Sequence, residues 1–173
     1  MSQPQKPTRG IVTFSCLAAR RHLFEKILPQ LTAYYGQPAA PPVFYNFTHS
    51  SYYEKEMGTN LVKMICGFQK LCARKNIYKA KWKAFKLEKK HSHNSRRLLN
   101  LDPGFLSAEN FILLTFKNFS HRIYMRKNVF AELTLQYSAA IKNFTDLPWT
   151  YPDYKQEKVK KYLLKLRHFL LGK

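Results

Sequence analysis

Two side chains in the second half of the chain have the types and spacing to hold an anionic ligand. The runs 121–125 and 129–137 alternate as strands and are separated by a short loop, which predicts a hairpin. If Met125 pairs with Val129, then Arg122 lies opposite Glu132, with Thr134 on the same face. An arginine that a carboxylate holds in place can offer a second edge of its guanidinium to phosphate. The same pair is also explained as a structural cross-strand ion pair.

Other polar residues of this half are candidates for the same ligand. Asp102 and Asp153 are also explained as caps, one of a Pro-Gly turn and the other of the last predicted helix. The segment Trp149–Tyr154 is a rigid aromatic loop that either walls a pocket or fixes the last helix to the sheet. His121 precedes Arg122 on a predicted strand, so the two side chains are expected on opposite faces. The ligand-binding candidates are Glu88, Asn100, Asp102, His121, Arg122, Glu132, Thr134, Tyr151 and Asp153.

Lysine and arginine form a second candidate surface. The chain has 30 Lys and Arg against 10 Asp and Glu, a net charge of +20, and the excess is concentrated in residues 63–97. Lysine alternates with apolar residues over 77–84, which predicts a strand with a basic face and an aromatic face. So large a charge predicts a polyanion partner, RNA more than DNA, although a solvated face that aids solubility is the alternative. The nucleic-acid-binding candidates are Lys79, Lys81, Lys83, Lys86, Lys89, Lys90, Arg96 and Arg97.

The sequence lacks the motifs of several common catalytic and cofactor sites. There is no Gly-rich phosphate loop, no Gly-flanked serine elbow and no paired Cys or His-Glu metal motif, so we expect no metal and no cofactor. Cys16, Cys66 and Cys72 lie in apolar runs and are odd in number, as reduced core cysteines would be. No apolar window approaches roughly 18 residues and no signal-peptide core is present. We therefore expect a cytoplasmic protein without a transmembrane segment.

Composition and periodicity predict an α+β fold. With 45% hydrophobic residues the chain can bury one core, so we expect a disordered lead-in at 1–8 and a single domain at 9–173. A mixed or mainly antiparallel sheet, packed with amphipathic helices that include a C-terminal one, is the expected architecture. Strands are predicted at 10–16, 43–47, 77–84 and in the hairpin, and helices at about 23–31, at 61–72 and at the C-terminus.

Turn and capping residues predict where these elements begin and end. Pro29 ends or kinks the first helix. Ser51 with Glu54 predicts a capping box for a short helical turn, and Asp153 with Gln156 predicts another for the last helix. The run Asp102-Pro103-Gly104-Phe105 predicts a type II turn.

Five strings of the sequence resemble one known family. They are Tyr53–Gly58 (YEKEMG), Asn100–Phe105 (NLDPGF), His121–Met125 (HRIYM), Ala131–Tyr137 (AELTLQY) and Trp149–Tyr154 (WTYPDY). In this order and spacing, the chain from about Arg9 to Leu170 resembles the prokaryotic domain-of-unknown-function family 4416. The resemblance implies a single-domain α+β fold and no particular activity. The chain departs from the family pattern at Ala84-Phe85 and at Asn128.

The sequence therefore supports two hypotheses of different classes. The first is a non-catalytic domain that binds nucleic acid, RNA above all, or another polyanion through the lysine set. The second is an enzyme or sensor for a small phosphorylated ligand, built around Arg122, Glu132, Asp102 and the 149–154 loop. The second requires these residues to meet in one concave pocket. The first requires the surplus cations to form one continuous patch.

Overall fold

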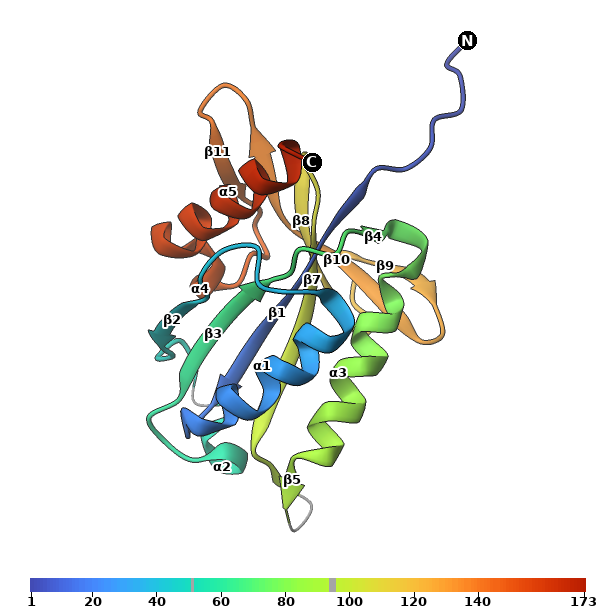
Figure 1. The fold of residues 1–173 in the computed structure, drawn as a ribbon. Coiled ribbons are helices and arrows are strands. Elements are labelled where there is room, and N and C mark those ends of the chain that lie inside the picture. Colours follow the sequence, from blue (N-terminus) through green and yellow to red (C-terminus); the bar gives the residue numbers. More distant parts are fainter. Residues whose placement is uncertain (51, 94–95) are drawn as a thin grey trace.

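An antiparallel sheet forms the centre of the computed structural model, which describes residues 1–50, 52–93 and 96–173. Within these residues, nine strands join in the order β11-β10-β8-β7-β1-β3-β2, with β4 paired to β1 and β9 paired to β10 (Figure 1). Their bounds are β1 Arg9–Ala18, β2 Val43–Asn46, β3 Val62–Gly67, β4 Cys72–Ala73, β7 Leu99–Leu106, β8 Asn110–Thr115, β9 Arg122–Arg126, β10 Val129–Ser138 and β11 Asn143–Asp146. A separate small ribbon consists of β5 Ser92–His93 and β6 Arg96–Arg97.

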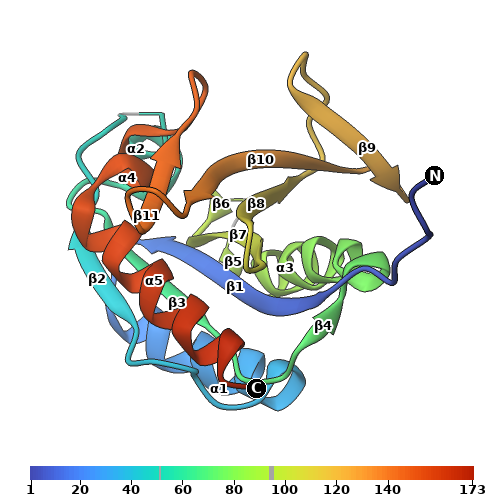
Figure 2. The ribbon, with the colours of Figure 1, turned by 90° about the horizontal axis from the view of Figure 1, so that it is seen from above.

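Helices cover both faces of this sheet. Their bounds are α1 His22–Tyr35, α2 Glu54–Met57, α3 Tyr78–Lys90, α4 Pro152–Lys155 and α5 Glu157–Leu171, with a 3-10 turn η1 at Arg74–Asn76. The sheet is strongly curved from β2 to β9, and α3 lies within the curve formed by β1, β10 and β9 (Figure 2). The expected α+β class, with an antiparallel sheet and a C-terminal helix, is confirmed.

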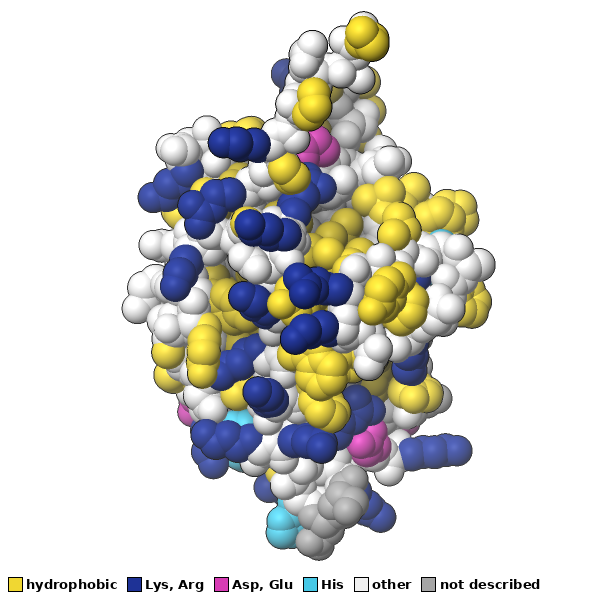
Figure 3. Space-filling view, turned by 90° about the vertical axis from the view of Figure 1, so that its right-hand side faces the viewer, with side chains coloured by type: hydrophobic (Ala, Val, Ile, Leu, Met, Phe, Trp, Pro, Cys, Tyr) yellow, Lys and Arg dark blue, Asp and Glu magenta, His cyan; other side chains and the backbone are white. Residues whose placement is uncertain are grey.

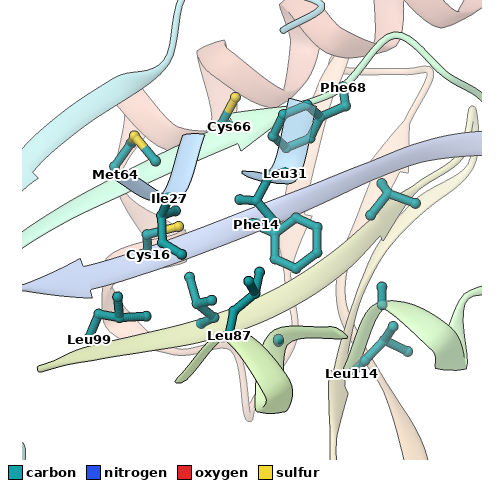
Figure 4. Packing of buried hydrophobic residues seen from close by; sticks show 14 of the residues in the cluster. Phe14, Cys16, Ile27, Leu31, Met64, Cys66, Phe68, Leu87, Leu99 and Leu114 are labelled. Carbon is teal, nitrogen blue, oxygen red and sulfur yellow. The ribbon is translucent and has the colours of Figure 1, made fainter. Parts of the chain in front are cut away.

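The alternation of β1 separates two hydrophobic cores. Val12, Phe14 and Cys16 point to the face covered by α1 and α3. Figure 4 shows Phe14 and Cys16 there with Ile27, Leu31 and other buried side chains. On the opposite face, Ile11 packs with α5 and α4. Because both faces of the strand are covered, β1 is buried along almost its whole length.

The segment 61–72, predicted as a helix, contains strand β3 instead. Val62–Gly67 lies between β1 and β2, and every residue of β3 after Val62 is buried. A central strand with both faces covered needs a continuous apolar run, and such a run also satisfies helical spacing. The prediction of a helix was therefore wrong. The elements that cover both faces of β3 come from other parts of the chain, and the local pattern does not reveal them.

The segment 77–84, predicted as a strand, instead leads into helix α3 and forms its first half from Tyr78 onward. The buried residues of α3 include Tyr78, Lys81, Ala84 and Leu87, which recur at helical spacing over the whole helix. The short alternation of lysine with apolar residues was misleading because lysine is itself a good helix former. The predicted basic ribbon with lysines on one face is therefore wrong.

The predicted turn at 102–105 is wrong as well, because these residues lie inside β7. Gly104 does not have a positive φ angle. A Cβ atom there would instead lie 2.6 Å from the Phe111 ring and 2.7 Å from the Thr13 Oγ1. Close packing of the strand against its neighbours, rather than a turn, requires the glycine.

The remaining predictions on element ends had mixed outcomes. Helix α1 continues past Pro29 to Tyr35, so the alternative in which the helix ends near Leu28 is wrong. Asp153 lies inside the separate short helix α4, and α5 begins at Glu157 without a side-chain cap. The capping box at 153–156 is therefore wrong. Ser51 lies outside the described residues.

The predicted hairpin is confirmed as β9 and β10. Glu132 pairs with Arg122, as expected, but Val129 pairs with Arg126 rather than with Met125. A register shift next to Val129 restores the expected pairing for the rest of the hairpin. Lys127 and Asn128 of the loop both have positive φ angles, of 50° and 61°.

Candidate functional site

The candidate site begins where β7 and β8 diverge. The two strands pair only from Gly104 to Leu106, whereas β7 starts at Leu99 and β8 continues to Thr115. Residues 99–103 of β7 therefore have no strand partner on the β8 side. A cleft of about 630 Å³ occupies this divergence, a volume in the range of small-molecule sites.

Two charged side chains of α3 take the place of the missing strand partner. The Leu101 N–H donates to Glu88 Oε1 at 2.6 Å, and Lys81 Nζ donates to the Leu101 carbonyl at 3.3 Å. Lys81 Nζ also donates to Asp102 Oδ1 at 3.3 Å. Both Lys81 and Glu88 are buried, so a free strand edge is satisfied by a lysine and a carboxylate that line the cleft.

The two carboxyl groups beside Lys81 have pKa values shifted in opposite directions. Burial raises the pKa of Glu88 above its ordinary value, and the bond from Leu101 and the Lys81 charge offset this only in part. Burial also acts to raise the pKa of Asp102, but the Lys81 and Lys63 charges and the Asn100 amide outweigh it and lower that pKa. One wall of the cleft thus carries a carboxyl group that holds its proton more readily than usual and one that loses it more readily.

A polar chain continues from Asp102 to the rim of the cleft. Asn100 Nδ2 donates to Asp102 Oδ2 at 2.6 Å, and Arg97 Nη1 donates to Asn100 Oδ1 at 3.0 Å. Arg97 is held in turn by Glu56 through Nε at 2.9 Å and Nη2 at 2.6 Å. This two-point bond lowers the pKa of Glu56 and raises the pKa of Arg97.

The opposite wall is built on the hairpin. Arg122 Nε donates to Glu132 Oε2 at 2.8 Å, its Nη2 donates to the Tyr151 hydroxyl at 3.0 Å, and its Nη1 donates to the Lys117 carbonyl at 3.1 Å. Glu132 is 1% exposed, and its Oε1 has no hydrogen-bond partner among the described residues. Burial raises the pKa of Tyr151. Arg122 is therefore held in the cleft by strand β10, by the segment after β8 and by the 149–154 loop.

His121 and Thr134 support this wall from behind and do not line the cleft. His121 Nε2 lies 3.1 Å from Glu132 Oε2, and its ring stacks on Trp149. The expectation that His121 and Arg122 point to opposite faces is wrong, because β9 begins only at Arg122. Thr134 lies at a bulge in β10, where its carbonyl accepts a bond of 2.6 Å from the Thr150 hydroxyl. These contacts hold the 149–151 loop, and with it Tyr151, against β10.

A third group of polar residues closes the inner end of the cleft. Asp153 is 3% exposed and accepts hydrogen bonds from Lys63 Nζ and from the Tyr45 hydroxyl. Burial and the Asp153 charge raise the pKa of Tyr45. The Lys63 ammonium also lies 5.0 Å from the centre of the Tyr154 ring. Asp153 therefore joins β2 and β3 to the C-terminal helices instead of capping α5.

Seven of the nine ligand-binding candidates converge on one cleft. They are Glu88, Asn100, Asp102, Arg122, Glu132, Tyr151 and Asp153. Aromatic side chains of the other lining segments complete it: Phe47, Tyr52, Tyr53, Phe85, Phe116 and Tyr154. The lining charges are nearly balanced, with the cations Lys63, Lys81, Arg97, Lys117 and Arg122 against the carboxylates Glu88, Asp102, Glu132 and Asp153.

Comparison with known proteins identifies the family of this chain. The family described as a domain of unknown function, DUF4416, matches residues 9–169. The chain belongs to the DUF4416 family. No curated protein and no solved structure matches this chain.

All five strings through which the chain resembles DUF4416 contribute lining residues to the cleft. Tyr53 comes from the first string, Asn100 and Asp102 from the second, Arg122 from the third and Glu132 from the fourth. The fifth string supplies the segment from Tyr151 to Tyr154. Segments that are far apart in this DUF4416 sequence thus meet at one place.

The nucleic-acid-binding candidates do not form one surface. Lys81 and Arg97 line the cleft and are paired with Asp102 and Glu56. Four others, at helical spacing, share the outer side of α3: Lys79, Lys83, Lys86 and Lys90. Lys89 lies off this stripe on the same helix, and Arg96 lies in β6.

Lys63 is one of the cleft residues that the candidate sets did not contain, as are Lys117 and most of the aromatic lining residues. Lys63 was read as one position of an amphipathic helix, whereas it is the single charged residue of the buried strand β3. A lone lysine within an otherwise apolar strand is a signal in itself, because a buried charge needs a partner.

Among the described residues, no group of three or more His, Cys, Asp or Glu side chains could hold a metal ion. In the same part of the chain, no helix is long and apolar enough to cross a membrane.

Proposed function

We propose that this domain is an enzyme or sensor that binds a small phosphorylated ligand in the cleft between β7 and β8. The observation that carries the proposal is the convergence of Arg122, Glu132, Asp102 and Tyr151, from three separate regions of the chain, on one concave site. Convergence of buried charged groups in a cleft is typical of a binding site and is costly for a purely structural arrangement.

Arg122 is suited to anchor the phosphate. Three of the five N–H donors of its guanidinium bond to protein groups in the structure, and two remain for a ligand. The Nη1 and Nη2 atoms each retain one hydrogen, which matches the spacing of two phosphate oxygens. Lys117, at the mouth of the cleft, supplies a second charge without a carboxylate partner among the described ion pairs.

The aromatic rim fits an organic group attached to the phosphate. Phe47, Tyr52, Tyr53, Phe85 and Phe116 line the cleft. Lys117 lies 5.5 Å from the centre of the Tyr52 ring, so the cationic and aromatic parts of the mouth are adjacent. Such a division into one charged and one apolar part is usual for sites that bind small organic anions.

The carboxyl pair beside Lys81 favours an enzyme over a sensor. Glu88 has a raised pKa and Asp102 a lowered one, and both line the cleft. Two carboxyl groups whose environments move their pKa values apart are suited to donate and to accept a proton on the same ligand.

The proposal is tested by titrating the protein with pyrophosphate in a calorimeter. Replacing Arg122 with glutamine is expected to weaken binding by about tenfold or more, since hydrogen bonds to charged groups contribute about 1.5 to 3 kcal/mol. Arg126→Gln is the matched control, because Arg126 is an exposed arginine on the same strand outside the cleft. It should change the affinity by less than about twofold.

A second variant keeps the test independent of folding. Arg122→Gln leaves the buried Glu132 without its main partner, whereas Lys117 is exposed and can be replaced with glutamine without disturbing the core. Lys117→Gln should weaken pyrophosphate binding about threefold or more at an unchanged melting temperature. Equal affinities for Arg122→Gln and Arg126→Gln, or an unchanged affinity for Lys117→Gln, would refute the proposal.

A further inference from the structure

A second concavity, on the other side of α3, differs from the cleft in its charges. This groove, of about 950 Å³, lies between the end of α1, β4 and the outer side of α3. Its lining contains six cationic side chains and no carboxylate: Arg9, Lys70, Lys79, Lys83, Lys86 and Lys127. The cations of the cleft are mostly neutralised by partners, whereas none of these six appears in an ion pair among the described residues. The groove therefore carries an uncompensated positive field.

The helical phase of α3 creates this separation. Lys79, Lys83 and Lys86 follow one another at intervals of four and three residues, so they share a side of the helix. Lys81 points to the opposite side and is bonded to Leu101 and Asp102 in the cleft. One helix thus presents a paired lysine to the cleft and a stripe of unpaired lysines to the groove.

Aromatic rings lie between the cations of the groove. Tyr34 is 55% exposed, and Lys83 Nζ lies 3.3 Å above the centre of its ring. This contact with the Lys83 ammonium lowers the pKa of Tyr34. Trp82 is partly buried and donates its indole N–H to the Lys127 carbonyl at 2.9 Å, which fixes the hairpin loop at the groove. Tyr35 and Tyr78 also line it.

The surrounding surface continues this character. Figure 3 shows the side of the molecule that carries α3, with Lys and Arg side chains spread over most of the face, hydrophobic side chains between them and few acidic ones. The groove is therefore the concave part of a wider positive face rather than an isolated cluster.

We propose that this groove binds single-stranded nucleic acid. Phosphates of the backbone would contact the six cations, and unpaired bases would stack on Tyr34 and the neighbouring rings. A duplex keeps its base faces stacked inside and cannot use the rings. A membrane surface offers phosphates to the cations but presents no unpaired bases to the rings. The combination of cations and rings therefore selects an unpaired strand over the other polyanions.

Binding is measured by fluorescence anisotropy with a labelled single-stranded RNA of mixed sequence. If about four phosphates are contacted, the affinity should fall by about 50-fold between roughly 50 and 200 mM salt. The double variant Lys79→Gln/Lys86→Gln should lower the slope of the logarithmic salt dependence by about 1.4. The matched control is Lys161→Gln/Lys165→Gln on α5, which removes the same charge from two exposed lysines outside the groove. It should leave the slope unchanged.

A second pair of variants tests stacking without changing charge. Tyr34→Ala should weaken RNA binding about fivefold or more at an unchanged salt slope. Tyr124→Ala is its control, because Tyr124 is exposed to a similar extent, 57%, on β9 outside the groove. Arg122→Gln, which tests the cleft, should leave RNA affinity unchanged, so the two proposals can fail separately.

Four results would overturn the inference. These are no RNA binding at low salt, equal losses in the Lys79/Lys86 and Lys161/Lys165 variants, equal affinity for duplex and single strand, and displacement of RNA by polyglutamate at the same charge concentration. The last result would assign the groove to acidic protein segments instead.

Discussion

Replacing Lys81 with methionine is expected to lower the free energy of unfolding by about 2 kcal/mol at pH 7. The lysine is 8% exposed and donates to both the Leu101 carbonyl and Asp102. Hydrogen bonds of charged groups contribute about 1.5 to 3 kcal/mol, and the apolar methionine side chain recovers part of this loss. For a chain of this length, the melting temperature should fall by about 4 to 8 °C.

A double-mutant cycle separates the ion pair from the other roles of Lys81. Asp102→Asn keeps the size of the side chain and removes its charge, so the two single changes should not add. The interaction energy between Lys81 and Asp102 should be about 1 kcal/mol, measured by urea unfolding followed through tryptophan fluorescence. Lys86→Met, on the exposed side of the same helix, is the control and should change stability by less than about 0.5 kcal/mol.

The cycle has a clear refuting result. If Lys81→Met unfolds at the same urea concentration as Lys86→Met, then Lys81 does not replace a strand partner at the edge of β7. Strict additivity with Asp102→Asn would show that the two charges do not interact, and the explanation of the lowered Asp102 pKa would then fail as well.

Two further predictions concern the walls of the cleft. Because burial raises the pKa of Glu88 above 4.5, the folded state holds this proton more tightly than the unfolded chain. Its stabilising contribution is present below that pH and is lost as the pH rises through the folded-state pKa. The stability difference between wild type and Glu88→Gln, measured by urea unfolding, should therefore fall from pH 4.5 upward, and a constant difference would contradict the cause of the shift. Gly104→Ala places a Cβ 2.6 Å from the Phe111 ring and should cost about 1 to 3 kcal/mol in thermal unfolding, whereas an unchanged melting temperature would show that β7 and β8 can separate freely.

Local signals predicted the hairpin and its key pair from sequence. Alternation over two nearby runs and a loop ending in Asn128 were sufficient to set Arg122 opposite Glu132. The exact pairing at Met125 was wrong because the loop adopts two positive φ angles and shifts the register for one residue. Such a register shift depends on the backbone geometry of the loop, which the alternation of residues along the strands does not determine.

Longer-range features could not be predicted in the same way. The segment of strand β3 was predicted as a helix, and the first half of helix α3 was predicted as a strand. Both errors arose because the neighbours of a segment in the fold decide whether one or both of its faces are buried. The cleft was also beyond local prediction. Its residues could be named one by one from the sequence, but they meet only because β7 and β8 diverge in the fold. Asp153 looked like a helix cap because its tertiary partner, Lys63, lies 90 residues away in the chain.

One rigid element carries lining residues of both concavities, since α3 presents Lys81 to one and Lys83 to the other. If ligand binding in the cleft displaces this helix, the free energy of ligand binding in the groove therefore changes as well. Thermodynamic reciprocity then requires the same factor in both directions, so RNA and pyrophosphate titrations performed in either order must give one coupling constant.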